Sequence, residues 1–141
     1  MAMDFELADL VTALPEIILS GVALVLVLIA AFGGDGAANA RRVAHLTLAG
    51  LALAALALLS VTSAHSTAFG GMFLSDAFAD YMKVLVLMGS FAAVFMSVKP
   101  LENDEINKPE FFLLVLLALV GMMLMISAND LMSLYMAVEL Q

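Results

Sequence analysis

Residues 111–127, FFLLVLLALVGMMLMIS, decide the fold of this chain. The run carries no charged side chain, and it is long enough for a helix to cross the roughly 30 Å hydrocarbon core of a bilayer. A polar stretch precedes it, and Pro109 and Glu110 are typical of a helix start. The stretch therefore predicts a membrane-spanning helix.

Further apolar runs lie on both sides of this one. Three come earlier, at residues 14–32, 43–62 and 77–98. The first of them has Pro15 and Glu16 in its opening turn, where a proline and an acid are both tolerated, and the third is expected to stop at Lys99-Pro100.

One more run, at residues 131–141, follows, with Asn129 or Asp130 as its expected N-cap. A helix over it could reach only roughly 16 Å, about half of the hydrocarbon core. We therefore predict an all-α fold: a polytopic transmembrane helix bundle with four spans and the first half of a fifth, in a single membrane region over residues 1–141.

The overall composition agrees with a membrane protein. The 141 residues are 65% hydrophobic and 13% charged, with a mean hydropathy of +1.12. A net charge of −8 argues against nucleic-acid binding, which needs clustered Lys and Arg. The chain has no cysteine, which excludes disulfides, thiolate zinc sites and cysteine-held iron–sulfur clusters on it. Redox chemistry is accordingly expected on other chains.

The basic residues predict how the chain is oriented. Arg41 and Arg42 lie between the first two spans, and Lys99 and Lys108 lie between the third and fourth. The positive-inside rule then places the N-terminus outside and both basic connections in the cytoplasm. Residues 1–10 contain acids and no basic residue, unlike a secretory signal peptide, so the first span should remain as an anchor.

Glu139 is the main candidate for chemistry. It lies eight residues beyond Leu131, roughly 12 Å along the last helix and close to the expected midplane of the membrane. A carboxylate there should face other helices, water or a basic partner, and it could relay protons near neutral pH. The alternatives are a protonated side chain that hydrogen-bonds between helices, or an acid that does not reach mid-membrane at all.

Three other residues are possible accessories. Tyr135 is four residues before Glu139 on the same helical face, where packing is the favoured role. Asp80 and Lys83 share a face at the entry to the third span. We favour an ion pair between these two at the membrane edge, with Lys83 extending toward the outer interface; the alternative is a buried ammonium that tunes a carboxylate.

No metal site is expected. His45 and His65 fall at opposite ends of the second span and are too far apart to share an ion. The methionines, which include Met122 and Met123, are interpreted as adaptable packing residues.

The second half of the sequence resembles a known family. Residues 110–140, EFFLLVLLALVGMMLMISANDLMSLYMAVEL, resemble the fourth and early fifth transmembrane helices of subunit N of bacterial NADH-quinone oxidoreductase, respiratory complex I. Residues 14–19 (LPEIIL), 76–79 (DAFA) and 121–123 (GMM) agree in the same order. The resemblance covers nearly the whole chain and implies the N-terminal part of an antiporter-like subunit in the bacterial inner membrane.

The resemblance also implies a function. Glu139 would match the family's glutamate on helix five, the proposed partner of a lysine on a broken seventh helix. The chain would contribute to redox-driven proton translocation beside other membrane subunits and lipid. NADH, FMN, iron–sulfur clusters and quinone would bind elsewhere in the complex. The alternatives are a sodium–proton antiporter or membrane-hydrogenase subunit with the same glutamate, and a structural membrane scaffold.

Overall fold

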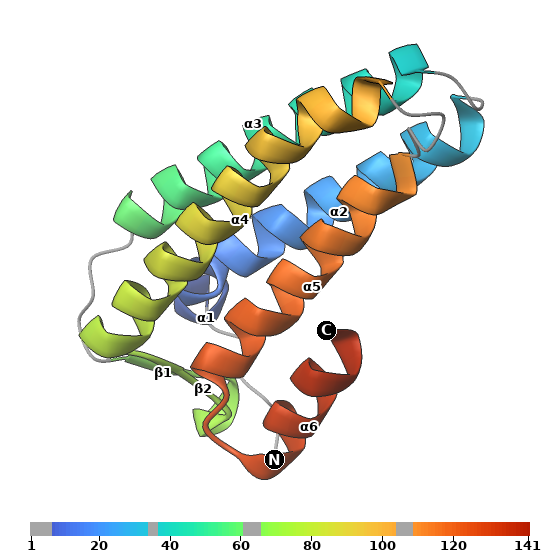
Figure 1. Cartoon of the computed structure of the whole chain (residues 1–141). Helices are drawn as coiled ribbons and strands as arrows, with labels where there is room; N and C mark the ends of the chain where they lie inside the picture. The colour runs from blue at the N-terminus through green and yellow to red at the C-terminus, as the bar shows by residue number, and fades with distance from the viewer. Residues whose placement is uncertain (1–6, 34–36, 61–65, 104–108) are drawn as a thin grey trace.

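Helices make up most of the structure, a computed structural model that describes residues 7–33, 37–60, 66–103 and 109–141 (Figure 1). The elements are α1 (Leu7–Thr12), α2 (Leu14–Phe32), α3 (Ala37–Ser60), β1 (Ser66–Ala68), a 3₁₀ turn η1 (Phe69–Gly71), β2 (Phe73–Ser75), α4 (Ala77–Asn103), α5 (Pro109–Ser127) and α6 (Leu131–Leu140).

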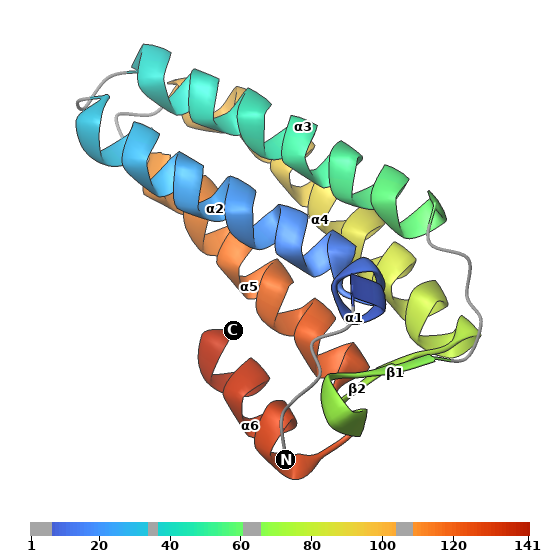
Figure 2. The same cartoon turned by 180° about the vertical axis from the view of Figure 1, so that it is seen from behind.

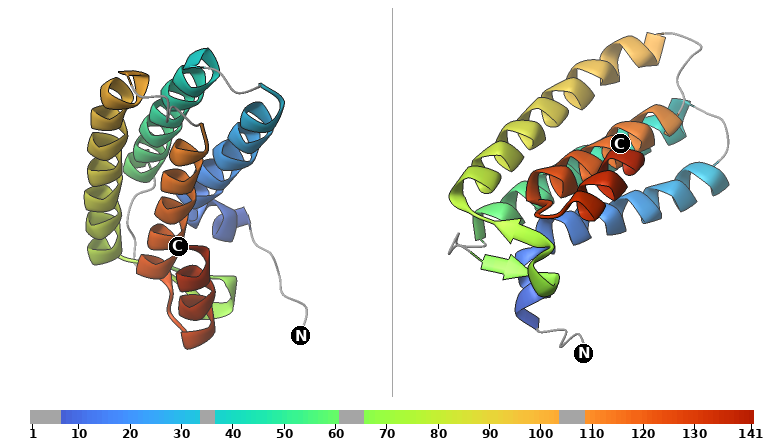
Figure 3. Two further views of the ribbon diagram at one scale, coloured as in Figure 1. Left: turned by 45° about the vertical axis from the view of Figure 1, so that its right-hand side comes forward. Right: turned by 90° about the horizontal axis from the view of Figure 1, so that it is seen from below.

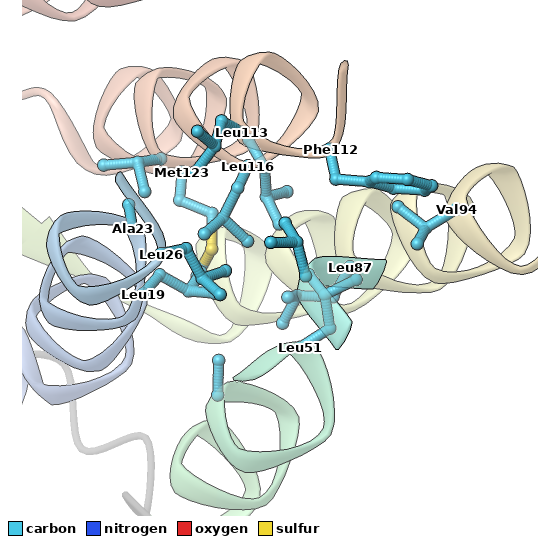
Figure 4. Close-up of a cluster of buried hydrophobic side chains, with 14 of the residues drawn as sticks. Leu19, Ala23, Leu26, Leu51, Leu87, Val94, Phe112, Leu113, Leu116 and Met123 are labelled. Atoms are coloured by element: carbon cyan, nitrogen blue, oxygen red, sulfur yellow. The ribbon is translucent and has the colours of Figure 1, made fainter. Parts of the chain in front are cut away.

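The four long helices α2, α3, α4 and α5 pack as a bundle, and each is long and apolar enough to cross a membrane (Figures 1 and 2). Helix α5 contacts the other three and α6 as well. Leu19, Leu26, Leu116 and Met123 converge from α2 and α5 on the bundle core (Figure 4). The outward faces are apolar too, as lipid or neighbouring membrane helices require.

The predicted fold class is confirmed, with corrections to some boundaries. Helix α2 has the expected bounds, whereas α3 begins at Ala37 instead of residue 43; the expected end of that span, at residue 62, lies outside the described residues. The apolar span Ala77–Val98 has the expected bounds, but the prediction that the helix stops at Lys99-Pro100 is wrong, because α4 continues to Asn103. Proline's fixed φ near −65° is itself helical, so close to a helix end its ring removes one hydrogen bond without ending the helix.

A β-hairpin and the short helix α1, both outside the expected spans, close one end of the bundle (Figure 2). The strands pair antiparallel, with Ser66 opposite Ser75 and Ala68 opposite Phe73. Between them the chain turns through three left-handed residues, Phe69, Gly70 and Gly71, with φ of 53°, 69° and 91°. Such a short hairpin needs support from elsewhere in the fold.

The support comes from the turn between α5 and α6. Ala128 forms a β-bridge with Phe73. The backbone N–H of Asn129 donates to Met72 O at 2.9 Å, and its side-chain amide donates to Gly71 O at 2.7 Å. The hairpin is therefore fixed to the point where the chain leaves α5 and enters α6.

Helix α6 folds back alongside α5 (Figure 3). Its N-cap is Asp130, one of the two residues expected there, whose Oδ1 accepts from Ser133 N–H at 2.6 Å. Close packing depends on Gly121, since a Cβ there would lie 2.9 Å from Gln141 N and 3.0 Å from Ala137 O. Both ends of α6 are thus held by specific contacts.

Candidate functional site

A buried ion pair joins α2 and α4. Lys83 Nζ lies 2.7 Å from Glu16 Oε1, and the two residues are only 1% and 3% exposed. The contact is one between opposite charges. Apart from it, neither carboxylate oxygen of Glu16 has a hydrogen-bond partner among the described residues. The pair therefore combines full burial with incomplete hydrogen bonding, which is unusual for charged groups.

Local sequence sets the position of each partner. Pro15 starts α2 and places Glu16 in its first turn. Asp76 caps α4 by accepting from Ala79 N–H at 2.7 Å, and Lys83 follows two turns later. Helices α2 and α4 begin at the same end of the bundle (Figure 1). The two charges therefore meet close to that end.

The hairpin covers the ion pair. The Phe73 ring centroid lies 4.9 Å from Lys83 Nζ, within the range of a cation–π interaction. Phe73 also forms a second buried cluster with Ala13 and Ala68, which covers the pair on the side of the hairpin. Burial on this side strengthens the attraction between the two charges.

Lys83 does not lie where the sequence pattern placed it. It was expected to extend toward the outer interface, but its side chain is turned inward and buried. Its partner Glu16 was not predicted as a site residue. Asp80, the expected partner, accepts a hydrogen bond from Ser75 Oγ at 3.3 Å.

A signal for the pair was present in the sequence. Glu16 is the single charged residue of α2, and Lys83 is the single basic residue between Ala77 and Val98. Each lies near the start of a span, and the two spans are expected to enter the membrane from the same side. Opposite charges at similar depth in two spans are expected to seek each other, since an unpaired charge in a membrane is expensive.

Glu139 and Tyr135 lie apart from this pair. Ala137 is the buried residue of α6, and Glu139 is two positions, roughly 200° of helical turn, away from it. Glu139 and Tyr135 are both exposed, and they share a face directed away from α5. The structure therefore does not bring Glu139 together with Lys83 or Asp80.

A groove of about 800 Å³ runs between α2 and α6. Its walls are mainly apolar, with Glu16 and Ser20 on α2 and Ser133 on α6 as polar members. Ala128 lines it too, and the preceding Ser127 has a buried hydroxyl without a hydrogen-bond partner in the described residues. Glu16 thus pairs with Lys83 and also lines the groove.

Metal binding finds no support in the described part of the chain, where no three His, Asp or Glu side chains cluster. His45 Nδ1 lies 2.7 Å from Arg41 O, one turn earlier on α3. His65 falls outside the described residues.

Relatives of this chain are known from bacteria, although no protein-family model matches it. It is 41% identical, over its full length, to NADH-quinone oxidoreductase subunit N 1 of Rhizobium meliloti. Subunit N of Rhodospirillum rubrum is 42% identical over 99% of the chain, and that of Maricaulis maris is 37% identical over 100%. The matches fall in the N-terminal part of these proteins, of whose length the chain spans 29%, 28% and 29% respectively.

Proposed function

Because the chain is a homologue of subunit N of bacterial NADH-quinone oxidoreductase, we propose that it serves as a membrane subunit of such a complex and contributes to proton translocation. Four helices able to cross a membrane support this assignment. The relatives' names favour it over a sodium–proton antiporter or a membrane-hydrogenase subunit. In this proposal NADH, FMN, the iron–sulfur clusters and quinone bind to other subunits in the bacterial cell membrane.

The observation that carries the proposed role is the position of Glu139 on α6. The helix is apolar around it, and the exposed face that bears Glu139 is available to further membrane helices. An acid on such a helix needs a polar or basic partner, and a carboxylate with an ammonium partner can take up and release a proton. We assign Glu139 as the proton-relay residue, with Tyr135 as an accessory on the same face.

The test is a Glu139→Gln substitution in the full-length protein within the intact complex. Glutamine keeps the size and polarity of the side chain but cannot release a proton. We expect normal assembly, with proton pumping and coupled quinone reduction both reduced by about a hundredfold, the lower end for loss of a positioned proton-transfer group. Pumping is measured by dye quenching in membrane vesicles, and assembly by native gel electrophoresis.

The matched control is Glu110→Gln. Glu110 is an exposed acid in the first turn of α5, outside the apolar centre of the bundle. This variant should pump at the wild-type rate. If a fully assembled Glu139→Gln complex pumps protons at the wild-type rate, Glu139 is not a proton-relay residue and its role is only structural.

A further inference from the structure

The ion pair between Glu16 and Lys83 has no role in the function proposed for Glu139. It lies on other helices, and Glu139 neither contacts it nor lines the groove beside it. A second ionised site within a membrane bundle therefore needs its own explanation.

Helix packing alone does not explain the pair. Two apolar side chains of similar volume would fill the same space without the desolvation penalty of two charges, and such replacements are often neutral or stabilising. Buried pairs that fix a structure also need hydrogen bonds to their remaining lone pairs. Both oxygens of Glu16 lack such bonds among the described residues.

The arrangement around Glu16 is asymmetric. Oε1 faces the ammonium of Lys83, whereas Oε2 is buried without a hydrogen-bond partner in the described part of the chain. The same side chain lines the groove between α2 and α6, whose other polar members are the hydroxyl groups of Ser20 and Ser133. Oε2 is therefore a buried acceptor without a described partner, on a side chain that lines a groove with two hydroxyl groups able to hydrogen-bond water.

We propose that Glu16 and Lys83 form a second proton-binding site, at which Glu16 exchanges a proton with water in the α2–α6 groove. A hydronium ion in the groove gives its proton to Oε2, an O–H bond forms, and water is left behind. Lys83 keeps its proton throughout, so the pair changes from net neutral to net positive. Release is the reverse step, and no electron is transferred.

The surrounding charges suit proton uptake. Apart from the pair itself, the titratable groups of the described residues at this end of the bundle are the carboxyl groups of Asp9 on α1, Asp76 and Asp80 on α4 and Asp130 before α6, and the phenol of Tyr81 on α4. None of them is basic. The neighbouring polar residues of β2, α5 and α6, namely Ser75, Ser127 and Ser133, are uncharged. A local excess of negative charge attracts hydronium to the site.

The direct test is pH-difference infrared spectroscopy of the full-length protein in lipid nanodiscs. The wild-type protein should show a protonated-carboxyl band that is lost in Glu16→Gln, is kept in Glu110→Gln, and shifts in D₂O because the proton exchanges with water. Identical spectra for wild type and Glu16→Gln, or a band that does not shift in D₂O, would overturn the proposal. This measurement needs no quinone oxidoreductase activity, so its outcome is independent of the role of Glu139.

A second experiment, in the intact complex, distinguishes proton binding from a purely structural role in holding α2 and α4 together. Single Glu16→Gln and Lys83→Met variants can fail to assemble for structural reasons, but the Glu16→Gln/Lys83→Met double variant removes both charges together. We expect the double variant to assemble and to lose proton pumping per electron transferred. A double variant that assembles and pumps like the wild type would show that the pair only fastens α2 to α4.

Discussion

Breaking the buried ion pair from one side should be far more damaging than removing it entirely. Lys83→Met deletes the ammonium while keeping a flexible side chain in the same space. Glu16 is then left in a site where it is 3% exposed and has no other described partner. Removing one member of a buried pair costs about 3–5 kcal/mol of folding stability, and screening by solvent does not reduce this because both residues are buried.

We expect the lower end, about 3 kcal/mol, because Glu16 can escape its unpaired charge by binding a proton. Loss of the contact with the Phe73 ring contributes to the same total. The double variant Glu16→Met/Lys83→Met should recover to within about 1 kcal/mol of the wild type, since two apolar side chains replace two charges. Glu16→Met alone leaves the ammonium of Lys83 unpaired and should also cost about 3 kcal/mol, so the coupling free energy in this double-mutant cycle is about 5 kcal/mol.

The assay is reversible unfolding of the full-length protein in mixed micelles by increasing SDS, followed by circular dichroism. Arg42→Met is the matched control because Arg42 is an exposed cation near the start of α3, and its loss should change stability by less than about 0.5 kcal/mol. A Lys83→Met variant as stable as this control would refute the argument, because the pair could not then be buried and mutually dependent as described.

Two further predictions concern α6. Gly121→Ala should destabilise the docking of α6 on α5 by about 1–3 kcal/mol, which is measured as faster proteolysis of α6. The control is Gly89→Ala on α4, where a Cβ would have open space, and it should leave the rate of proteolysis unchanged. Hydrogen bonds from Ser133, first from its side chain and then from its backbone N–H, hold the pKa of Asp130 below its usual value of 3.8. The cap should therefore stabilise α6 fully above pH 3.8 and weaken as pH falls through the lowered pKa of Asp130. Amide hydrogen exchange in the first turn of α6 should accelerate over this pH range in the wild type, and it should not do so in Asp130→Asn.

The spans were predictable because each depends on its own residues. An uncharged apolar run such as residues 111–127 predicts a transmembrane helix whatever surrounds it. The pairing of Glu16 with Lys83 escaped prediction because it depends on how α2 and α4 pack, and spacing along one helix suggested Asp80 instead. For Glu139, the sequence predicts its depth in the membrane, and the structure adds that it lies on the exposed face of α6. A basic partner for Glu139 stays a prediction.

The hairpin was missed for a different reason. Its strands have three residues each, too short for an alternating pattern to stand out, and they are stabilised by contacts made elsewhere. The bridge between Phe73 and Ala128 joins residues that no local pattern relates. Elements that exist only through tertiary support are the ones that a single sequence does not reveal.

The hydrogen bonds between the hairpin and Asn129 relate the length of the hairpin to the depth of α6 in the membrane. Asn129 immediately precedes the cap of α6, and two hydrogen bonds fix it to Met72 and Gly71 in the turn of the hairpin. The length of the hairpin therefore sets how deep α6 begins, and with it the level at which Glu139 sits. Inserting or deleting residues in this extramembrane segment would move that acid along the bilayer normal without altering any transmembrane residue.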